Sequence, residues 1–194
     1  LEETRALLEV VEILNSTLDS RQLLKRAAMT IARVCRVDRC SLELWEGERV
    51  IPLMSQYADG RKDPAKWTAF QTVVSRPLLE VPMNARAIET RRPVVVEDAL
   101  HSDQLPREWV ELFGMKATMA VPMIRQDQVI GVITLDYCDQ ARPFEAWQQD
   151  LAMTIAGQLA LSLENTRLYT EAQERLRETT TLLNVAQILS QQGP

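Results

Sequence analysis

The chain contains 194 residues, 46% of them hydrophobic, and carries a formal net charge of −5, values that are typical of one globular domain with some additional length. The acidic balance lacks the basic surplus of nucleic-acid-binding domains, and no uncharged apolar stretch reaches the roughly 18 residues that a membrane-spanning helix needs. Because the sequence contains one histidine, most histidine-dependent catalysis and histidine-rich metal sites are excluded.

Two helices are predicted at the start of the chain. The first carries apolar residues at heptad-like intervals, namely Leu7, Val11, Leu14 and Leu18. Asp19 and Gln22 have the spacing of a helix-capping box, which predicts that a second helix begins there. Its apolar face includes Ile31 and Cys35.

A change in the apolar period predicts two strands after these helices. Apolar residues then alternate with others, as Cys40, Leu42 and Leu44 do with Ser41, Glu43 and Trp45. Such alternation is typical of a strand. Residues 50–57 predict a second strand, paired with the first in a hairpin that turns at Gly47. Residues 58–82 are polar and irregular, with a short packed helix around Trp67 and Phe70, and connections of that length are often functional.

Two short helices flank a short strand in the middle of the chain. Asn84 is placed to cap a helix over residues 84–89, and residues 94–96 form a compact apolar strand. A second helix is predicted over residues 102–113, with Gly114 as its C-terminal cap.

The most apolar strands follow these short helices. Residues 117–124 and 129–137 predict an antiparallel hairpin that turns at Gln126 and Asp127. The nearly continuous apolar character of residues 129–135 indicates a central strand that is covered on both faces.

A final helix is predicted from Pro143 to about residue 190, and its end repeats the start of the chain. Residues 1–14 align without gaps to residues 176–189, with eight of fourteen positions identical. One interpretation is coincidence between two leucine-rich amphipathic helices. The other is that the C-terminus opens a second copy of the same module. The chain, which begins with Leu1, would then be a fragment of a longer protein with tandem modules.

Four sequence features, taken with the order of these elements, resemble the GAF domain family. They are Leu18-Asp19 with the helix that follows, and residues 37–42 (VDRCSL), 87–98 (AIETRRPVVVED) and 129–135 (VIGVITL). The resemblance covers about residues 19–165. It implies an α+β fold with a central antiparallel sheet of about five to six strands. The N- and C-terminal helices would cover one face, and short helices and loops the other. Residues 1–18 would be a signalling and dimerisation helix, and residues 166–194 a linker helix that runs into a second module.

Few residues of this chain match those that the known activities of the family require. Cyclic-nucleotide-binding members carry a Phe between an Asn-Lys pair and an Asp-Glu pair, and only Phe144 matches. Covalent bilin attachment needs a cysteine in the middle loops, but none lies between Cys40 and Cys138. Members that reduce methionine sulfoxide use three cysteines, and Cys35, Cys40 and Cys138 are not placed for that chemistry. We therefore expect no catalytic residues, no cofactor and no enzymatic activity.

His101 leaves a haem or metal site as an alternative. It is the one imidazole available as an axial haem ligand, and with Asp98 and Asp103 it forms three possible metal ligands within six residues. The polar surroundings favour a solvated surface histidine, so no metal site is predicted. A redox sensor that uses Cys138 is a further alternative.

A small non-covalent ligand is the main possibility. Because ligand sites are mostly apolar with a few polar groups, the candidate pocket residues are Trp67, Phe70, Asp98, Leu105, Trp109, Met115, Thr118 and Met119. The alternative is that Leu105, Trp109 and Met115 fill this space themselves. A homodimer through the terminal helices is also predicted, with its interface at Leu7, Val11, Leu14, Leu18, Ile155, Leu159, Tyr169, Leu176 and Leu183.

These features together predict a non-catalytic sensory module of a cytoplasmic bacterial signalling protein, with a multidomain sensor histidine kinase as the leading parent. Ligand binding would bias the terminal helices and so regulate an output domain in the same parent chain. The alternatives are a ligand-free dimerisation or spacer module, and a regulator of a cyclic-di-GMP enzyme or of a transcription activator. No nucleic-acid partner is expected, and no membrane span is expected within this fragment.

Overall fold

The computed structural model describes residues 20–46, 49–73 and 81–191. The chain divides into two compact units, one that ends at Ala160 and one that begins at Leu161. The predicted helical seam within residues 1–18 lies outside the described residues. None of the described helices combines the length and the apolar character that crossing a membrane requires.

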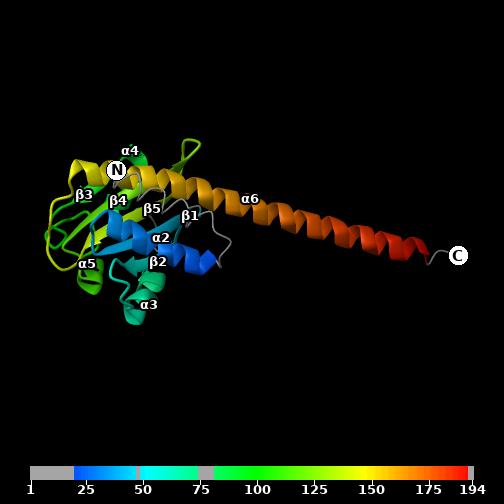
Figure 1. Cartoon of the computed structure of the whole chain (residues 1–194), viewed down its shortest axis with the longest axis horizontal. Helices are drawn as coiled ribbons and strands as arrows, with labels where there is room; N and C mark the ends of the chain where they lie inside the picture. Colours follow the sequence, from blue (N-terminus) through cyan, green and yellow to red (C-terminus); the bar gives the residue numbers. More distant parts are fainter. Residues whose placement is uncertain (1–19, 47–48, 74–80, 192–194) are drawn as a thin grey trace. The chain divides into compact units, whose positions relative to one another are not determined.

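A five-stranded sheet forms the centre of the first unit, with the strand order β2-β1-β5-β4-β3 (Figure 1). The strands are β1 (Arg39–Glu46), β2 (Arg49–Tyr57), β3 (Val94–Val96), β4 (Ala117–Arg125) and β5 (Gln128–Tyr137). All neighbouring strands pair antiparallel, which confirms the predicted sheet. The strand predicted to be covered on both faces is β5, and it occupies the middle of the sheet.

The hairpin between β4 and β5 turns where the sequence predicts it. Arg125 pairs with Gln128, so the loop consists of Gln126 and Asp127. Both residues have positive φ, 43° and 66°. Two successive residues with positive φ are typical of a type I′ turn, whose twist matches that of the flanking strands.

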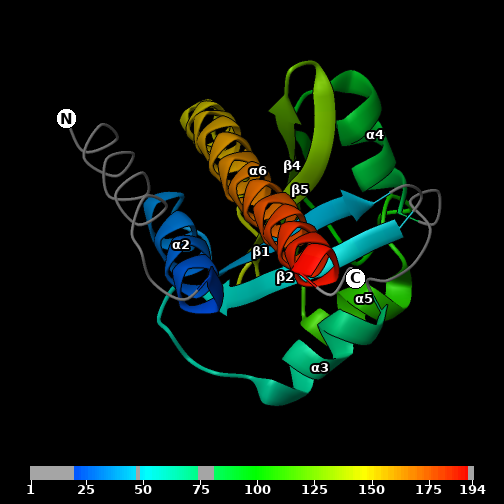
Figure 2. The same ribbon diagram turned by 90° about the vertical axis from the view of Figure 1, so that its right-hand side faces the viewer.

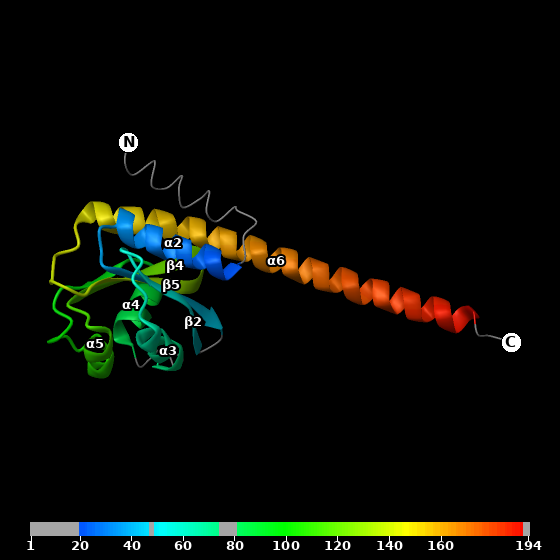
Figure 3. The ribbon, with the colours of Figure 1, turned by 60° about the horizontal axis from the view of Figure 1, so that its bottom comes forward.

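Helices cover both faces of the sheet (Figure 3). α2 (Ser20–Val34) and the start of α6 (Ala146–Gln191) cover one face, where Ala28, Ile31 and Ile155 are fully buried. α3 (Pro64–Val73), α4 (Pro82–Thr90) and α5 (Arg107–Phe113) lie on the opposite face. The predicted arrangement, with terminal helices on one face and short helices on the other, is confirmed.

A hydrophobic cluster fills the space between the sheet and the short helices. Its buried members are Val50, Phe70, Val81, Met83, Ala87, Val96, Ala99, Leu105, Trp109, Val110, Phe113, Met115, Ala120 and Val132. These residues come from four strands, from α3, α4 and α5, and from the connections beside them. The cluster therefore holds the short helices against the sheet.

Side chains of β1 alternate between the two helical layers, because neighbours in a strand point to opposite faces. Cys40 and Leu42 are fully buried on the face covered by α2. Arg39 and Glu43 point to the layer of short helices and are each 4% exposed. The alternation predicted from the sequence is present, but its polar side is buried as well as its apolar side.

The first short helix after the irregular segment begins earlier than predicted. α4 starts with Pro82, because proline suits the first turn of a helix, where its missing N–H is not needed. Asn84 is therefore inside the helix, is 2% exposed, and does not act as the predicted cap.

The next helix begins later than predicted and ends as predicted. α5 starts at Arg107 because Pro106 disfavours helical backbone at the residue before it. Gly114 adopts a φ of 65° after the helix and donates its N–H to the Val110 carbonyl. This left-handed geometry confirms Gly114 as the C-terminal cap.

Candidate functional site

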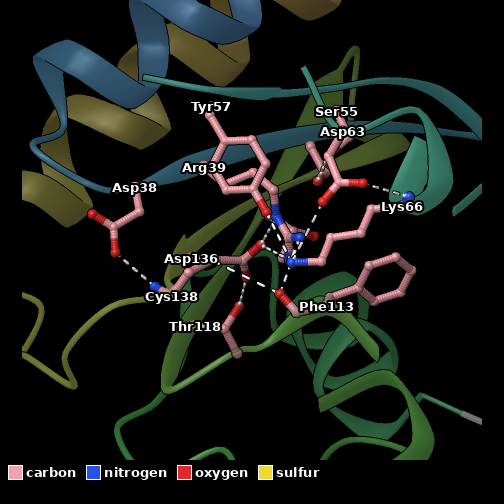
Figure 4. Close-up of polar contacts among 12 residues, drawn as sticks. Asp38, Arg39, Ser55, Tyr57, Asp63, Lys66, Phe113, Thr118, Asp136 and Cys138 are labelled. Atoms are coloured by element: carbon pink, nitrogen blue, oxygen red, sulfur yellow. Dashed lines mark hydrogen bonds and ion pairs between the residues drawn. The ribbon is translucent and has the colours of Figure 1, made fainter. Parts of the chain in front are cut away.

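A buried ion pair joins β1 to the central strand. Arg39 and Asp136 are register partners on β1 and β5, and Nε and Nη2 of Arg39 donate to Oδ2 of Asp136 at 2.9 and 2.8 Å. The Thr118 hydroxyl donates to Oδ1 at 2.7 Å, and Nη1 of Arg39 donates to the Phe113 carbonyl at 3.3 Å. Figure 4 shows these contacts, which tie β1, β4 and β5 to the end of α5.

Arg39 keeps its charge despite its burial. Burial by itself lowers the pKa of Arg39, but the Asp136 carboxylate and its hydrogen bonds raise it, and the net shift of the pKa is upward. The two opposite charges neutralise each other within the protein interior. We therefore regard the pair as a fixed structural element and not as a charge available to a ligand.

A pocket of about 450 Å³ lies at the edge strand β2, next to this ion pair. Its walls come from α2, β1, β2, the loop after β2, the start of α3 and the end of α5. Figure 2 shows the ribbon of these elements. We call it the outer pocket, and its lining consists of Gln22, Lys25, Arg39, Met54, Ser55, Gln56, Tyr57, Arg61, Lys62, Asp63, Pro64, Lys66, Trp67 and Phe113. Small-molecule sites typically have volumes of about 300–1,000 Å³.

Tyr57 is surrounded by the cations of the outer pocket. The guanidinium carbon of Arg61 lies 4.0 Å from the centre of the Tyr57 ring, that of Arg39 lies 5.8 Å away, and Nζ of Lys66 lies 5.9 Å away. Lys66 also donates to the Tyr57 hydroxyl at 3.3 Å and lies 3.7 Å from Oδ2 of Asp63. The pocket thus combines positive charge with aromatic faces.

A second cavity of about 30 Å³ shares Arg39 and Phe113 with the outer pocket. We call it the inner cavity, and its lining consists of Arg39, Ser41, Glu43, Phe70, Val81, Met83, Asn84, Trp109, Phe113, Met115, Thr134 and Asp136. A space of this size holds about one or two water molecules.

Glu43 is the buried acid of the inner cavity. Asn84 Nδ2 and the Thr134 hydroxyl donate to its two carboxyl oxygens, each at 3.4 Å. Burial, together with the nearby charge of Asp136, raises the pKa of Glu43 to about 8. Asn84 Oδ1 and Trp109 Nε1 also face buried surroundings and have no hydrogen-bond partner among the described residues.

The thiols and the single imidazole contribute little to either pocket. Burial raises the pKa of Cys35 and Cys138 to about 12, and that of Cys40 well above its usual value. All three are therefore protonated and weakly nucleophilic at neutral pH. His101 is exposed, with Nδ1 at 2.8 Å from Oδ2 of Asp98. In the described part of the chain, no three His, Cys, Asp or Glu side chains converge as a metal site.

The structure divides the predicted pocket residues between several places. Trp67 lines the outer pocket. Phe70, Trp109 and Met115 line the inner cavity, and Leu105 belongs to the hydrophobic cluster. The side chains that were expected to share one pocket therefore lie in two neighbouring spaces and in the core between them.

The remaining predicted residues lie outside the linings of both pockets. Thr118 is fully buried and bonded to Asp136. Asp98 is on the surface and is bonded to His101. Met119 follows Thr118 in β4 and so faces the layer of α2 and α6, because neighbours in a strand alternate.

Sequence analysis did not identify the charged residues at the centre of the site. Arg39 and Glu43 recur with the period of two that places them on one face of β1, and Thr134 and Asp136 do so on β5. Polar residues at every second position of otherwise apolar strands were the available signal. This signal indicates a buried polar face only when helices also cover the face of the sheet to which the polar residues point.

The predicted dimer residues also fall into separate environments. Ile155 and Leu159 are fully buried within the first unit, whereas Leu176 belongs to the second unit and is 68% exposed. Leu7, Val11, Leu14 and Leu18 lie outside the described residues, as do the side chains of Tyr169 and Leu183. The dimer therefore remains a prediction.

Comparison with known proteins identifies a family match over the folded part of the chain. The sequence model of the GAF domain family matches residues 19–163. A search of curated proteins finds no match.

Several solved structures share the fold. The GAF domain of a phosphoenolpyruvate-protein phosphotransferase from Coxiella burnetii has a TM-score of 0.72 and 16% identity, over 88% of this chain and 97% of that chain. The corresponding domain from Acinetobacter has a TM-score of 0.65 and 19% identity, over 85% and 94%. Free methionine-R-sulfoxide reductase from Neisseria meningitidis has a TM-score of 0.66 and 15% identity, over 86% and 91%. At these identities the likeness concerns the fold.

Proposed function

The chain belongs to the GAF domain family of sensory and regulatory modules found in signalling proteins, and from this premise we propose that it is a non-catalytic sensor of a small molecule. The outer pocket is the observation that carries this proposal. It has a volume of about 450 Å³, which is in the range of small-molecule sites. Its wall includes Arg39, whose ion pair reaches the central strand.

A connected set of contacts supports a route from this pocket to α6. Arg39 lines the pocket and holds Asp136, and the next residue, Tyr137, points to the opposite face of the sheet. There Gln148 of α6 donates to the Tyr137 hydroxyl at 3.0 Å and to the Cys35 carbonyl at 2.6 Å. A ligand with different affinities for two positions of these elements would shift the population of α6 positions.

We propose that α6 passes the signal on in a homodimer. α6 continues to Gln191, and its residues in the second unit include the exposed leucines Leu161, Leu168 and Leu176. An exposed row of leucines on a helix is stabilised when a second helix covers it. The output domain would lie in the same parent chain, in a cytoplasmic bacterial sensor histidine kinase first, and in a cyclic-di-GMP enzyme or a transcription activator as alternatives.

A ligand-free spacer is the second candidate function. The observation that favours it is the inner cavity, which holds only about 30 Å³ because Phe70, Trp109 and Met115 pack around it. If the outer pocket binds nothing, the domain would act only through its terminal helices.

Thermal unfolding with a metabolite panel tests the two candidates. A compound that binds the folded state raises Tm by mass action, and isothermal titration then measures its Kd. We expect Trp67→Leu, in the outer pocket, to weaken binding of such a compound. Trp147→Leu, outside the pocket lining, should leave it unchanged. If no compound of the panel raises Tm, the result would contradict the sensor function and favour the spacer.

A further inference from the structure

The outer pocket is a positively charged region in a protein with a formal net charge of −5. Lys25, Arg61, Lys62 and Lys66 line it, and Asp63 is the acidic residue of its described lining. Resting on the proposed sensor function, we propose that its ligand is a small organic anion, with a carboxylate or phosphate group on a flat apolar body.

The carboxylate of Asp63 already makes contacts at the start of α3. Oδ1 of Asp63 accepts the backbone N–H of Lys66 at 3.0 Å, which is the bond that a helix-capping residue makes. Asp63 thus neutralises the partial positive charge at the start of α3. Its other oxygen lies 3.7 Å from Nζ of Lys66, so it offsets part of one cation and leaves the others.

The other cations of the outer pocket have only weak ion pairs, or none, among the described residues. Arg61 lies 3.3 Å from Asp59 and 3.9 Å from Asp139, but all three side chains are at least 46% exposed, and ion pairs of such exposure contribute little free energy. No ion pair among the described residues includes Lys25 or Lys62. We do not count Arg39, because Asp136 neutralises it. A ligand anion would therefore meet three or more cations without breaking a strong contact.

The aromatic lining accounts for the flat apolar body. Tyr57 and Phe113 are 6% and 4% exposed, and Trp67 is half-buried beside them in the same lining. The half-buried Trp67 ring can stabilise a planar apolar group by stacking. Tyr57 and Phe113 add apolar wall beside it, because each is almost fully buried and has a guanidinium near its ring. Because the Tyr57 ring already has three cations near it, the charge and the aromatic faces of the pocket are close together.

A set of probes with one body and different charge separates these features. Isothermal titration of the 194-residue chain would use 2-naphthoate, 2-naphthyl phosphate, 2-naphthamide and 2-naphthylmethylammonium at constant ionic strength. We expect at least one anion to bind about tenfold more tightly than the amide and the ammonium. The preferred anion identifies carboxylate or phosphate. Added salt should weaken binding of the anion more than that of the amide.

Two kinds of pocket variant test the assignment, because one should weaken anion binding and the other should strengthen it. Lys66→Gln with Lys62→Gln should weaken anion binding about three- to tenfold and weaken amide binding much less. Asp63→Asn keeps a good capping residue but removes the negative charge, so it should strengthen anion binding. A gain of affinity cannot arise from loss of folding. Lys116→Gln, an exposed lysine outside the lining, is the matched control and should change nothing.

Two results would overturn the proposal. Equal affinity for the anions and the amide, or no binding of any naphthyl probe, would show that the pocket does not select flat organic anions. The sensor function would still stand if a neutral or cationic metabolite raised Tm through Trp67. It would fail separately if no metabolite of the panel did so.

Discussion

Arg39 and Asp136 face each other on β1 and β5, and two N–H groups of the guanidinium donate to a single carboxylate oxygen at 2.9 and 2.8 Å. The two residues are 97 positions apart in the sequence. Arg39 lines both the outer pocket and the inner cavity, and Asp136 lines the inner cavity.

Removal of one partner of this pair should destabilise the domain strongly. We expect Asp136→Leu to lower the free energy of unfolding by about 3–5 kcal/mol, because it leaves the Arg39 charge buried and unpaired. The double variant Arg39→Met, Asp136→Leu should recover most of this loss. Urea denaturation at pH 7 measures both. As a control, Glu111→Gln breaks an exposed pair with Arg107 and should have little effect. Equal stability of the single and double variants would argue against the assigned role.

Glu43 should make the stability of the domain fall as the pH rises. Burial raises its pKa from 4.5 to about 8, so between these values the folded protein holds a proton that the unfolded chain releases. The free energy of unfolding therefore decreases by up to about 1.4 kcal/mol per pH unit over this range. Glu43→Gln keeps a neutral group of similar shape. It should gain stability relative to the wild type from pH 5 to 8, and a constant difference would contradict the raised pKa.

Gly131 should tolerate no side chain, because β1 runs against it. A Cβ at this position would overlap the Glu43 carbonyl oxygen and lie 3.1 Å from the Leu44 Cα, and both are backbone atoms of the paired strand. We expect Gly131→Ala to lower the free energy of unfolding by about 1–3 kcal/mol. Gly157→Ala is the matched control, since nothing lies within 4 Å of its Cβ position. It should raise that free energy by about 0.5–1 kcal/mol through helix propensity.

The exposed leucines of α6 should determine the oligomeric state. Leu168 and Leu176 are 47% and 68% exposed, and we expect Leu168→Glu with Leu176→Glu to convert a dimer into a monomer. Light scattering after size exclusion measures the mass. Thr170→Glu with Thr181→Glu adds the same charge on the other side of the helix and should leave the dimer intact. A monomeric wild type at high micromolar concentration would contradict the proposed dimer.

The cysteines should react slowly in the folded protein. Burial raises the pKa of Cys35 and Cys138 to about 12, and the reactive form of a thiol is its thiolate. We expect iodoacetamide at pH 7.5 to label neither in minutes, and to label all three cysteines in urea. Mass spectrometry counts the labels. Fast labelling of Cys138 in the folded state would instead favour a redox-sensing role.

Elements whose signals are local were predicted well. The cap at Gly114 has backbone geometry that few residue types other than glycine favour, so the residue type itself indicates it. The turn at Gln126 and Asp127 was predicted because these two polar residues separate two apolar runs. The central position of β5 was predicted from its apolar sequence. Helix starts were less predictable, because Asn84 has the residue type of a cap, yet Pro82 begins the helix two residues before it.

The site depended on relationships that no local pattern contains. Trp67 was predicted as a pocket residue because ligand sites are mostly apolar, and the structure places it in the outer pocket. Tyr57 and Lys66 were not identified, since their proximity arises only when α3 packs against β2. Asp98 was predicted on composition, and the structure places it on the surface beside His101.

By itself, the sequence determined the order of elements and the alternation of side chains along β1, because these follow from spacing along the chain, and its resemblance to the GAF segments indicated the family. Only the tertiary structure decided that the polar side of that alternation is buried. α3, α4 and α5 cover this face, so Arg39 and Glu43 lose their contact with water. Each must then find a compensating interaction in the interior, with Asp136 for Arg39 and a bound proton for Glu43. Which residues meet there depends on strand register and helix packing, and these bring together positions far apart in the sequence.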